Sequence, residues 1–185
     1  MAMDETRKLL QRRASEYLFN HSRGVEKCAC RLAQVYGVDK AKASLAGLLH
    51  DYGKIYPEKV LRQIALEQSL GDELIFREPK LLHAPVGAWL LRHELGIGDE
   101  DVLAAIRVHT TGAAGIPLLA KIVYLADYIE PGRVYPGVDE LRRIAFKNLN
   151  QALLNALERT IKHVLEKKKV LHPDSIAFRN SLLLS

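Results

Sequence analysis

The chain has 185 residues, of which 48% are hydrophobic and 26% charged, and its formal net charge is +5. This balance is typical of one ordinary folded domain and excludes a disordered chain. No apolar run reaches the roughly 18 residues of a membrane span, and the polar start, Met1 to Arg13, lacks a signal-peptide stretch. We therefore expect a cytoplasmic protein with no membrane partner. The positive charge is compatible with an anionic ligand but identifies none.

Apolar residues recur at helical spacing along the chain, and alternating strand-like runs are absent. Gly37 is suited to end a first long helix, and Asp39 is suited to cap the next, which leads to His50. Further helices are expected to begin near Pro57, Pro85, Asp99 and Pro117. The pattern predicts an all-α fold.

The last third of the sequence begins with a loop over Glu130–Val138 that is rich in proline and glycine. A long amphipathic helix is predicted over about 139–169, with Asp139 as its N-cap. Its basic residues, Arg142 among them, are interpreted as a solvated face. Since no linker or repeat interrupts the chain, we expect a single domain over 1–185, with a motif-bearing core at about 18–133.

Cys28 and Cys30 are the only cysteines. At this spacing they point in different directions from a helix, so neither a disulfide nor a thiol metal clip is expected. We expect both to be reduced, partly buried thiols.

Four histidines and two aspartates lie where helix-like segments end: His21, His50, Asp51, His83, His109 and Asp127. Imidazole and carboxylate are ligands for first-row transition metals. Six such groups exceed what one metal takes while leaving room for water and substrate. A lone histidine near a helix end is more often a cap or surface residue, and we assign His93, His163 and His172 to that class.

The order His, His-Asp, Asp resembles the signature of the HD-domain metal-dependent phosphohydrolases. The added histidines, within residues 81–88 and 105–112, resemble those of its two-metal branch. Residues 121–133, with His172-Pro173-Asp174-Ser175 and Arg179-Asn180, look like the bacterial YqeK-type symmetrical bis(5'-nucleosyl)-tetraphosphatases.

This resemblance spans roughly His21 to Leu184. The chain departs from the pattern at Leu18, where relatives often carry a basic residue, and at Gly53, where they often carry alanine. Neither departure removes a ligand.

The resemblance implies an HD-domain helical bundle with a dinuclear metal site. One metal would be held by His21, His50, Asp51 and Asp127, while Asp51 would bridge to a second metal held by His83 and His109. Iron is the metal that the resemblance implies, and manganese, cobalt or zinc would also accept these ligands. Metal-bound hydroxide would then cleave diadenosine tetraphosphate symmetrically into two ADP, without a side-chain nucleophile.

The substrate would be a dinucleoside polyphosphate, with ADP or GDP as product-like ligands. Lys54 and Arg133 are the candidate catalytic cations, because each can stabilise phosphate charge. Thr110, Thr111 and Gly112 are candidate phosphate contacts through hydroxyl donors and a close backbone approach. For Lys54 a solvated lysine, and for the threonines a helix end, stay open as alternatives. Glu130 is expected to orient Arg133 or a ligand histidine rather than to act as a base.

Other functions stay open. An HD-domain hydrolase of another nucleotide or of a guanosine alarmone would use the same metals. A nucleotide-binding regulatory module without catalysis is a second class, although all six ligand positions are filled. A nucleic-acid partner is not expected, because aromatic residues are only 6% and no basic-aromatic motif occurs. The sequence does not decide whether the protein is a homodimer.

Overall fold

The computed structural model describes residues 3–184, and this part of the chain is helical without any strand. The all-α prediction is confirmed there. The α-helices and two short 3-10 helices, η1 and η2, are, in chain order, α1 (Met3–Arg13), α2 (Glu16–Tyr36), α3 (Lys40–Leu49), η1 (Tyr52–Ile55), α4 (Glu58–Glu67), α5 (Glu73–Arg77), η2 (Pro79–Leu81), α6 (His83–Leu95), α7 (Glu100–Arg107), α8 (Leu118–Ile129), α9 (Val138–Ala145), α10 (Leu149–Glu166) and α11 (Pro173–Leu183).

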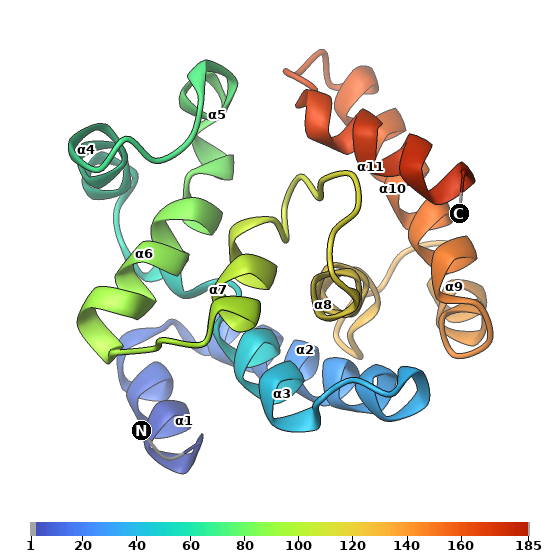
Figure 1. The fold of residues 1–185 in the computed structure, drawn as a ribbon, viewed down its shortest axis with the longest axis horizontal. Coiled ribbons are helices and arrows are strands. Elements are labelled where there is room, and N and C mark those ends of the chain that lie inside the picture. Colours follow the sequence, from blue (N-terminus) through green and yellow to red (C-terminus); the bar gives the residue numbers. More distant parts are fainter. Residues whose placement is uncertain (1–2, 185) are drawn as a thin grey trace.

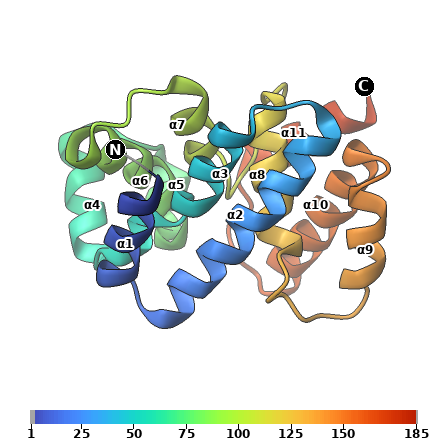
Figure 2. The same cartoon turned by 90° about the horizontal axis from the view of Figure 1, so that it is seen from below.

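Helix α8 occupies the middle of the fold, where Figure 1 shows it nearly end-on. It packs against α2, α3, α7 and α10. Most of its side chains are buried, and its own sequence is apolar on nearly every face, as expected of a helix that neighbours surround. In Figures 1 and 2, α4–α6 lie on one side of α8 and α9–α11 on the other.

The predicted helix ends agree with the structure where local chemistry decides them. Gly37 adopts the left-handed conformation at φ 71° and ends α2. The side chains of Asp39 and Asp99 accept hydrogen bonds from the first-turn N–H groups of α3 and α7. Pro117 directly precedes α8. Pro85, by contrast, is the third residue of α6, which already begins at His83.

The predicted helix over 139–169 is wrong as a single element, because the chain breaks between α9 and α10. Asn148 leaves the helical conformation, and its side chain accepts a hydrogen bond from the Gln151 N–H at 3.0 Å. The Tyr36 hydroxyl donates to the carbonyl oxygen of Ala145 at 2.7 Å. Asp139 is not the N-cap, since it lies in the first turn of α9 and pairs with Arg142.

The two cysteines are free thiols, as expected, with Cys28 buried and Cys30 half-buried. Burial raises the pKa of Cys28 to about 12. Within residues 3–184, no helix combines the length and the apolar character that crossing a membrane requires.

Candidate metal centre

The six candidate ligands come from five parts of the chain that meet beside α8. His50 ends α3, Asp51 follows it directly, and His83 opens α6. His109 lies just after α7, and Asp127 lies in the last turn of α8. Only His21 differs from the expected position at a helix end, because it lies in the second turn of α2.

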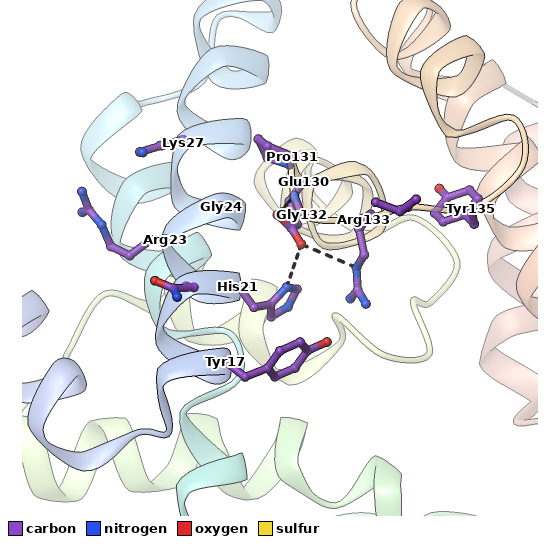
Figure 3. Close-up of a pocket in the computed structure, with 12 residues that line it drawn as sticks. Tyr17, His21, Arg23, Gly24, Lys27, Glu130, Pro131, Gly132, Arg133 and Tyr135 are labelled. Carbon is purple, nitrogen blue, oxygen red and sulfur yellow. Dashed lines mark hydrogen bonds and ion pairs between the residues drawn. The ribbon is translucent and has the colours of Figure 1, made fainter.

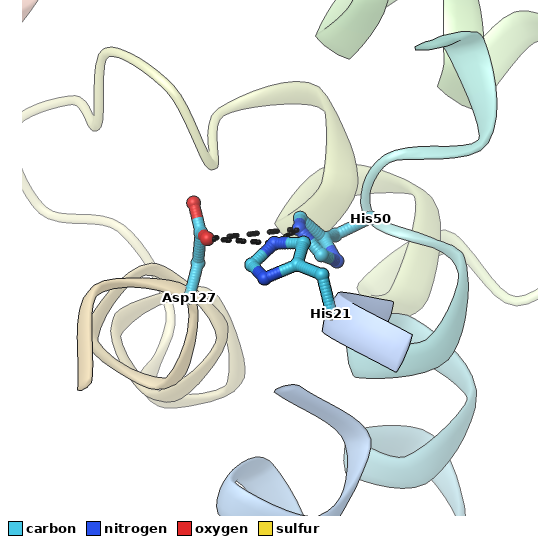
Figure 4. Close-up of side chains that lie close together, drawn as sticks. All are labelled: His21, His50 and Asp127. Carbon is cyan, nitrogen blue, oxygen red and sulfur yellow. Dashed lines mark hydrogen bonds and ion pairs between the residues drawn. The ribbon is translucent and has the colours of Figure 1, made fainter. Parts of the chain in front are cut away.

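One group of ligand atoms gathers around His21. Its Nε2 lies 3.2 Å from Nε2 of His50 and 3.1 Å from Oδ1 of Asp127. Figure 4 shows these three side chains pointing toward one another from α2, the end of α3 and α8. Their donor atoms lie within 4.8 Å of one another, which is close enough for one shared metal ion.

A second group of ligand atoms gathers around Asp51, whose two carboxylate oxygens face different histidines. Oδ1 of this carboxylate lies 3.1 Å from Nε2 of His83 and 3.4 Å from Nε2 of His109. Its Oδ2 faces the first group, at 3.3 Å from Nε2 of His50 and 3.6 Å from Nε2 of His21. Asp51 is therefore positioned between two sets of imidazoles, with one oxygen directed at each.

Backbone carbonyls fix the orientation of three of the rings. Nδ1 of His50 lies 2.9 Å from the Gly47 carbonyl oxygen, and Nδ1 of His109 lies 2.7 Å from that of Ile106. Nδ1 of His83 contacts a carbonyl oxygen in the same way, at 2.6 Å. Since a carbonyl only accepts hydrogen bonds, each Nδ1 carries a proton, and each ring turns its Nε2 toward the inside of the site.

The inward-facing ring nitrogens indicate that the site is suited to cations. Nε2 of His83 and Nε2 of His109 are 3.0 Å apart, so these two rings turn the nitrogens that can bind a metal toward the same point. Oδ1 of Asp51 is buried and has no hydrogen-bond partner. An uncompensated buried oxygen is costly, whereas neutral imidazole and carboxylate together suit a divalent transition metal. The residues present therefore fit a metal centre.

Ionisation in the site supports this ligand chemistry. Burial lowers the pKa of His109 to about 4, so this ring is neutral at pH 7. Burial also acts to raise the pKa of Asp51, but the imidazoles of His50, His109 and His83 hold it well below its usual range. Both groups are thus in the form that coordinates metals.

Two cations lie against the carboxylates of the centre. The ammonium of Lys54 is 2.7 Å from Oδ2 of Asp51, and its side chain is 46% exposed. Nη2 of Arg133 is 2.5 Å from Oδ1 of Asp127, and its Nε donates to the Asp127 carbonyl oxygen at 2.9 Å. Each cation is thus at the edge of the centre, where a bound anion would approach.

Glu130 is buried beside His21, as Figure 3 shows. Its Oε1 lies 3.2 Å from Nδ1 of His21 and 4.0 Å from Nε of Arg133, and its Oε2 accepts the Gly132 N–H at 2.6 Å. The expectation that Glu130 orients a ligand histidine agrees with these contacts. Gly24 makes room for it, because a Cβ there would lie 2.2 Å from Oε2 of Glu130.

Sequence reasoning missed Arg142 as a supporting residue. Its guanidinium donates to the carbonyl oxygens of Ile129, Glu130 and Arg133 at 2.8 to 2.9 Å. Interpreting it as part of a solvated helix face was wrong, since these bonds hold the loop that follows Asp127. The sequence shows only that Asp139 lies three residues before Arg142, a spacing that allows an ion pair on a helix.

Gly53 allows η1 to lie directly against the start of α6. A Cβ at this position would lie 2.3 Å from the carbonyl oxygen of His83, which is too close for any other residue without a backbone shift. The glycine therefore brings the Asp51 segment next to His83.

The segment from Thr110 to Gly112 contacts α11. The Thr111 hydroxyl donates to the Gly112 carbonyl oxygen at 3.0 Å, and Gly112 has φ 67°. A Cβ on Gly112 would lie 2.2 Å from the ring of Phe178, so this glycine permits a close helix contact. None of the three residues lines the hollows beside His21, Asp51 and His83.

The remaining histidines have other contacts. His93 stacks on Trp89 with ring centroids 4.1 Å apart. His172 caps α11 by accepting the Asp174 N–H, and its Nε2 contacts Asp72 at 2.9 Å. These contacts agree with the structural interpretation of both residues.

A helical fold with a histidine and aspartate cluster of this order defines the HD-domain class. The chain belongs to the HD-domain family, whose model matches residues 18–132, and this family binds divalent metals.

Relatives that match nearly the full chain narrow the comparison. A Bacillus subtilis (strain 168) protein named "Bis(5'-nucleosyl)-tetraphosphatase, symmetrical" is 40% identical over 99% of this chain and 98% of its own length. A protein of the same name from Halalkalibacterium halodurans is 44% identical over 95% of this chain and 94% of its own. A crystal structure described as a predicted HD superfamily hydrolase involved in NAD metabolism, from Clostridium acetobutylicum, is 42% identical. It matches with a TM-score of 0.95 and covers 100% of this chain and 98% of that one.

Proposed function

We propose that this chain is a metal-dependent hydrolase that cleaves diadenosine tetraphosphate symmetrically into two ADP. One water molecule is consumed as the central P–O–P bridge opens, and each product keeps two phosphates. The observation that carries the proposal is the convergence of the inward-facing imidazoles on both oxygens of Asp51. Near full-length similarity to proteins named as symmetrical bis(5'-nucleosyl)-tetraphosphatases supports the choice of substrate.

The proposed ligand set divides at Asp51 between two metal ions. One ion takes His21, His50, Asp51 and Asp127, and the other takes Asp51, His83 and His109. We propose iron as the native metal, with manganese, cobalt and zinc as ions that the same nitrogen and oxygen ligands accept. When bound, such ions would lower the pKa of a coordinated water and neutralise phosphate charge.

The chain itself orients the ligands and neutralises the substrate. Carbonyl oxygens and Glu130 hold the Nδ1 protons of the four imidazoles, so that every Nε2 stays directed inward. Lys54 and Arg133 contribute fixed positive charge beside Asp51 and Asp127. Positive charge held in advance stabilises the negative charge that builds up as the phosphate bridge opens.

The test is product analysis with metal-loaded protein and a panel of dinucleoside polyphosphates, mononucleotides and guanosine alarmones. In oxygen-18 water, diadenosine tetraphosphate should yield two ADP, with one labelled oxygen on the terminal phosphate of one of them. ATP and AMP as first products would contradict the symmetrical reaction. Binding without any product would favour a regulatory module, and faster turnover of an alarmone would favour another HD-domain substrate.

A further inference from the structure

Three hollows border the candidate metal ligands. The largest, of about 680 Å³, reaches His21, and the smallest, of about 220 Å³, reaches His21 and Asp51. The third, of about 490 Å³, reaches His83. Arg133 lines the first two, and Lys54 lines the last two. Each hollow thus shares lining residues with the next, and we call the two larger ones the arms of a groove along the candidate ligands, one beside His21 and one beside His83.

The larger arm, which we call the α2 arm, lies between α2 and the loop after α8. Its lining includes Tyr17, which is 76% exposed, and Val134, which is 92% exposed. In Figure 3 the Tyr17 ring and the Arg133 guanidinium point to the same side of α2, whereas Arg23 extends to the opposite side. An exposed aromatic ring contributes little to a core, but it offers a flat surface on which a nucleobase can stack.

The other arm, which we call the η1 arm, lies between η1, α4 and η2. Tyr56, Leu61 and Pro79 give it an apolar wall, and Lys54 and Lys80 give it two ammonium groups. Lys80 is exposed, and within residues 3–184 no carboxylate pairs with its ammonium. The acidic group of this arm, Glu58, makes only a long contact of 3.9 Å to Arg62.

The backbone ties Lys80 to the metal centre. The carbonyl oxygen of Lys80 lies 2.6 Å from Nδ1 of His83. The backbone of Lys80 is therefore held next to a candidate ligand. Arg133 has the corresponding place in the α2 arm, through its contact with Asp127. Each arm thus has a cation near the centre and apolar side chains for a base.

We propose that the two arms each hold one ADP half of the substrate, with the phosphates toward Asp51 and the adenosines outward. This inference rests on the proposed function. It explains why the central P–O–P bridge of the tetraphosphate is cleaved rather than an outer one. Two arms that each accept a nucleoside diphosphate place the centre opposite the middle of the tetraphosphate. Cleavage into ATP and AMP would require three phosphates on one side of the centre and one on the other.

The direct test is calorimetric titration of the metal-loaded protein with ADP. Wild type should bind two ADP per chain, while Tyr17→Ala and Lys80→Ala should each retain one site in the same concentration range. Tyr17→Phe, which keeps the ring, and Lys80→Arg, which keeps the charge, should restore the second site. Lys59→Ala, an exposed lysine on α4 outside the groove, is the matched control and should bind two.

Kinetics with diadenosine tetraphosphate give a second measurement. Loss of one stacking surface or one phosphate contact should raise KM about tenfold and change kcat by no more than about twofold. The increases should multiply in the Tyr17→Ala, Lys80→Ala double variant, because the two arms are separate.

Binding of one ADP per wild-type chain would overturn the two-arm inference, as would an unchanged KM in Lys80→Ala. Either result can occur while wild type still produces two ADP, in which case the proposed function stands. Conversely, two ADP sites without any hydrolysis would support the groove and contradict the proposed function.

Discussion

Each imidazole of the cluster is held through the nitrogen that does not face the centre. Three rings use carbonyl oxygens only three residues earlier in the chain, so their orientation is a local property of a helix end. His21 instead uses the carboxylate of Glu130, which is 109 residues away. The first kind of support survives most substitutions, since it involves backbone, whereas the second depends on one side chain.

Asp51 is the residue on which both groups of imidazoles depend. Asp51→Ala should lower turnover at least about 100-fold and reduce the metal content below two ions per chain, because it removes the carboxylate and leaves cationic charge uncompensated. Steady-state rates and elemental analysis measure the two effects. His93→Ala is the matched control and should be nearly silent, because His93 stacks on Trp89 away from the cluster. Similar activity in the two variants would show that the wrong histidines and aspartates had been chosen.

Glu130 should act through His21 rather than on the substrate. Glu130→Gln removes the charge that favours the Nδ1 proton, and we expect metal affinity to fall about 10- to 100-fold while saturating metal restores much of kcat. Competition with a chromogenic chelator measures the affinity. An unchanged affinity with a lower kcat would instead assign Glu130 a direct part in the reaction.

At the scale of elements, a polar network ties α1 to η1 and α6. Glu94 on α6 accepts hydrogen bonds from the hydroxyls of Tyr52 at 2.9 Å and Tyr56 at 2.6 Å, and it pairs with Arg13 of α1 at 3.0 Å. Arg13 also contacts the Tyr56 hydroxyl. Because Asp51 directly precedes Tyr52, this network positions η1, which carries Lys54.

The Glu94 network predicts a pH dependence of stability. Burial acts to raise the pKa of Glu94, but hydrogen bonds from Tyr56 and Tyr52 and the charge of Arg13 lower it below its ordinary value. A lowered pKa in the folded state adds stability above the unfolded value, and this stability is lost as the pH falls through the folded value. Because the side chain is about a third exposed, we expect a contribution of about 1 kcal/mol or less.

Urea unfolding of wild type and Glu94→Gln between neutral pH and pH 3 measures this contribution. Glu94→Gln should be less stable at neutral pH, and the difference should shrink as the pH falls. Glu100→Gln is a suitable control, because that carboxylate is on the surface and pairs with Arg92 away from the Glu94 network. A difference that stays constant with pH would contradict the assignment.

At the scale of the whole molecule, the metal centre joins helices from most of the fold. Its candidate ligands come from α2, the end of α3, the start of α6, the end of α7 and α8. The helices α9 and α10 contribute no ligand, but Arg142 of α9 holds the loop that follows α8. A bound ion would therefore stabilise the native packing of elements that are far apart in sequence.

Removal of metal should lower thermal stability. An ion present at 100 times its dissociation constant stabilises the folded state by about 2.7 kcal/mol. For a chain of this size that corresponds to a shift in Tm of roughly 5 to 10 °C. Calorimetry before and after dialysis against a chelator, followed by readdition of metal, measures the shift. The same treatment of Asp51→Ala should change Tm much less, and equal shifts in both proteins would place the stabilising ion elsewhere.

The sequence by itself determined the features that depend on neighbouring residues. Asp39, Asp99 and Gly37 end or begin helices through bonds that span only a few residues, so their positions could be read directly. The order of candidate ligands and the HD-domain family were equally visible, because motif spacing is a property of the chain.

Contacts between segments that are distant in sequence became visible only in the folded chain. The break after α9 escaped prediction because the apolar spacing continues across it and because Tyr36, whose hydroxyl donates to Ala145 at the end of α9, is distant in sequence. Asn148, by contrast, begins α10 through a local bond from the Gln151 N–H. The pairing of Glu130 with His21 and the fit of Gly53 against His83 also depend on packing. Hydrogen bonds and close approaches of this kind arise between surfaces that meet only after folding, so no local pattern encodes them.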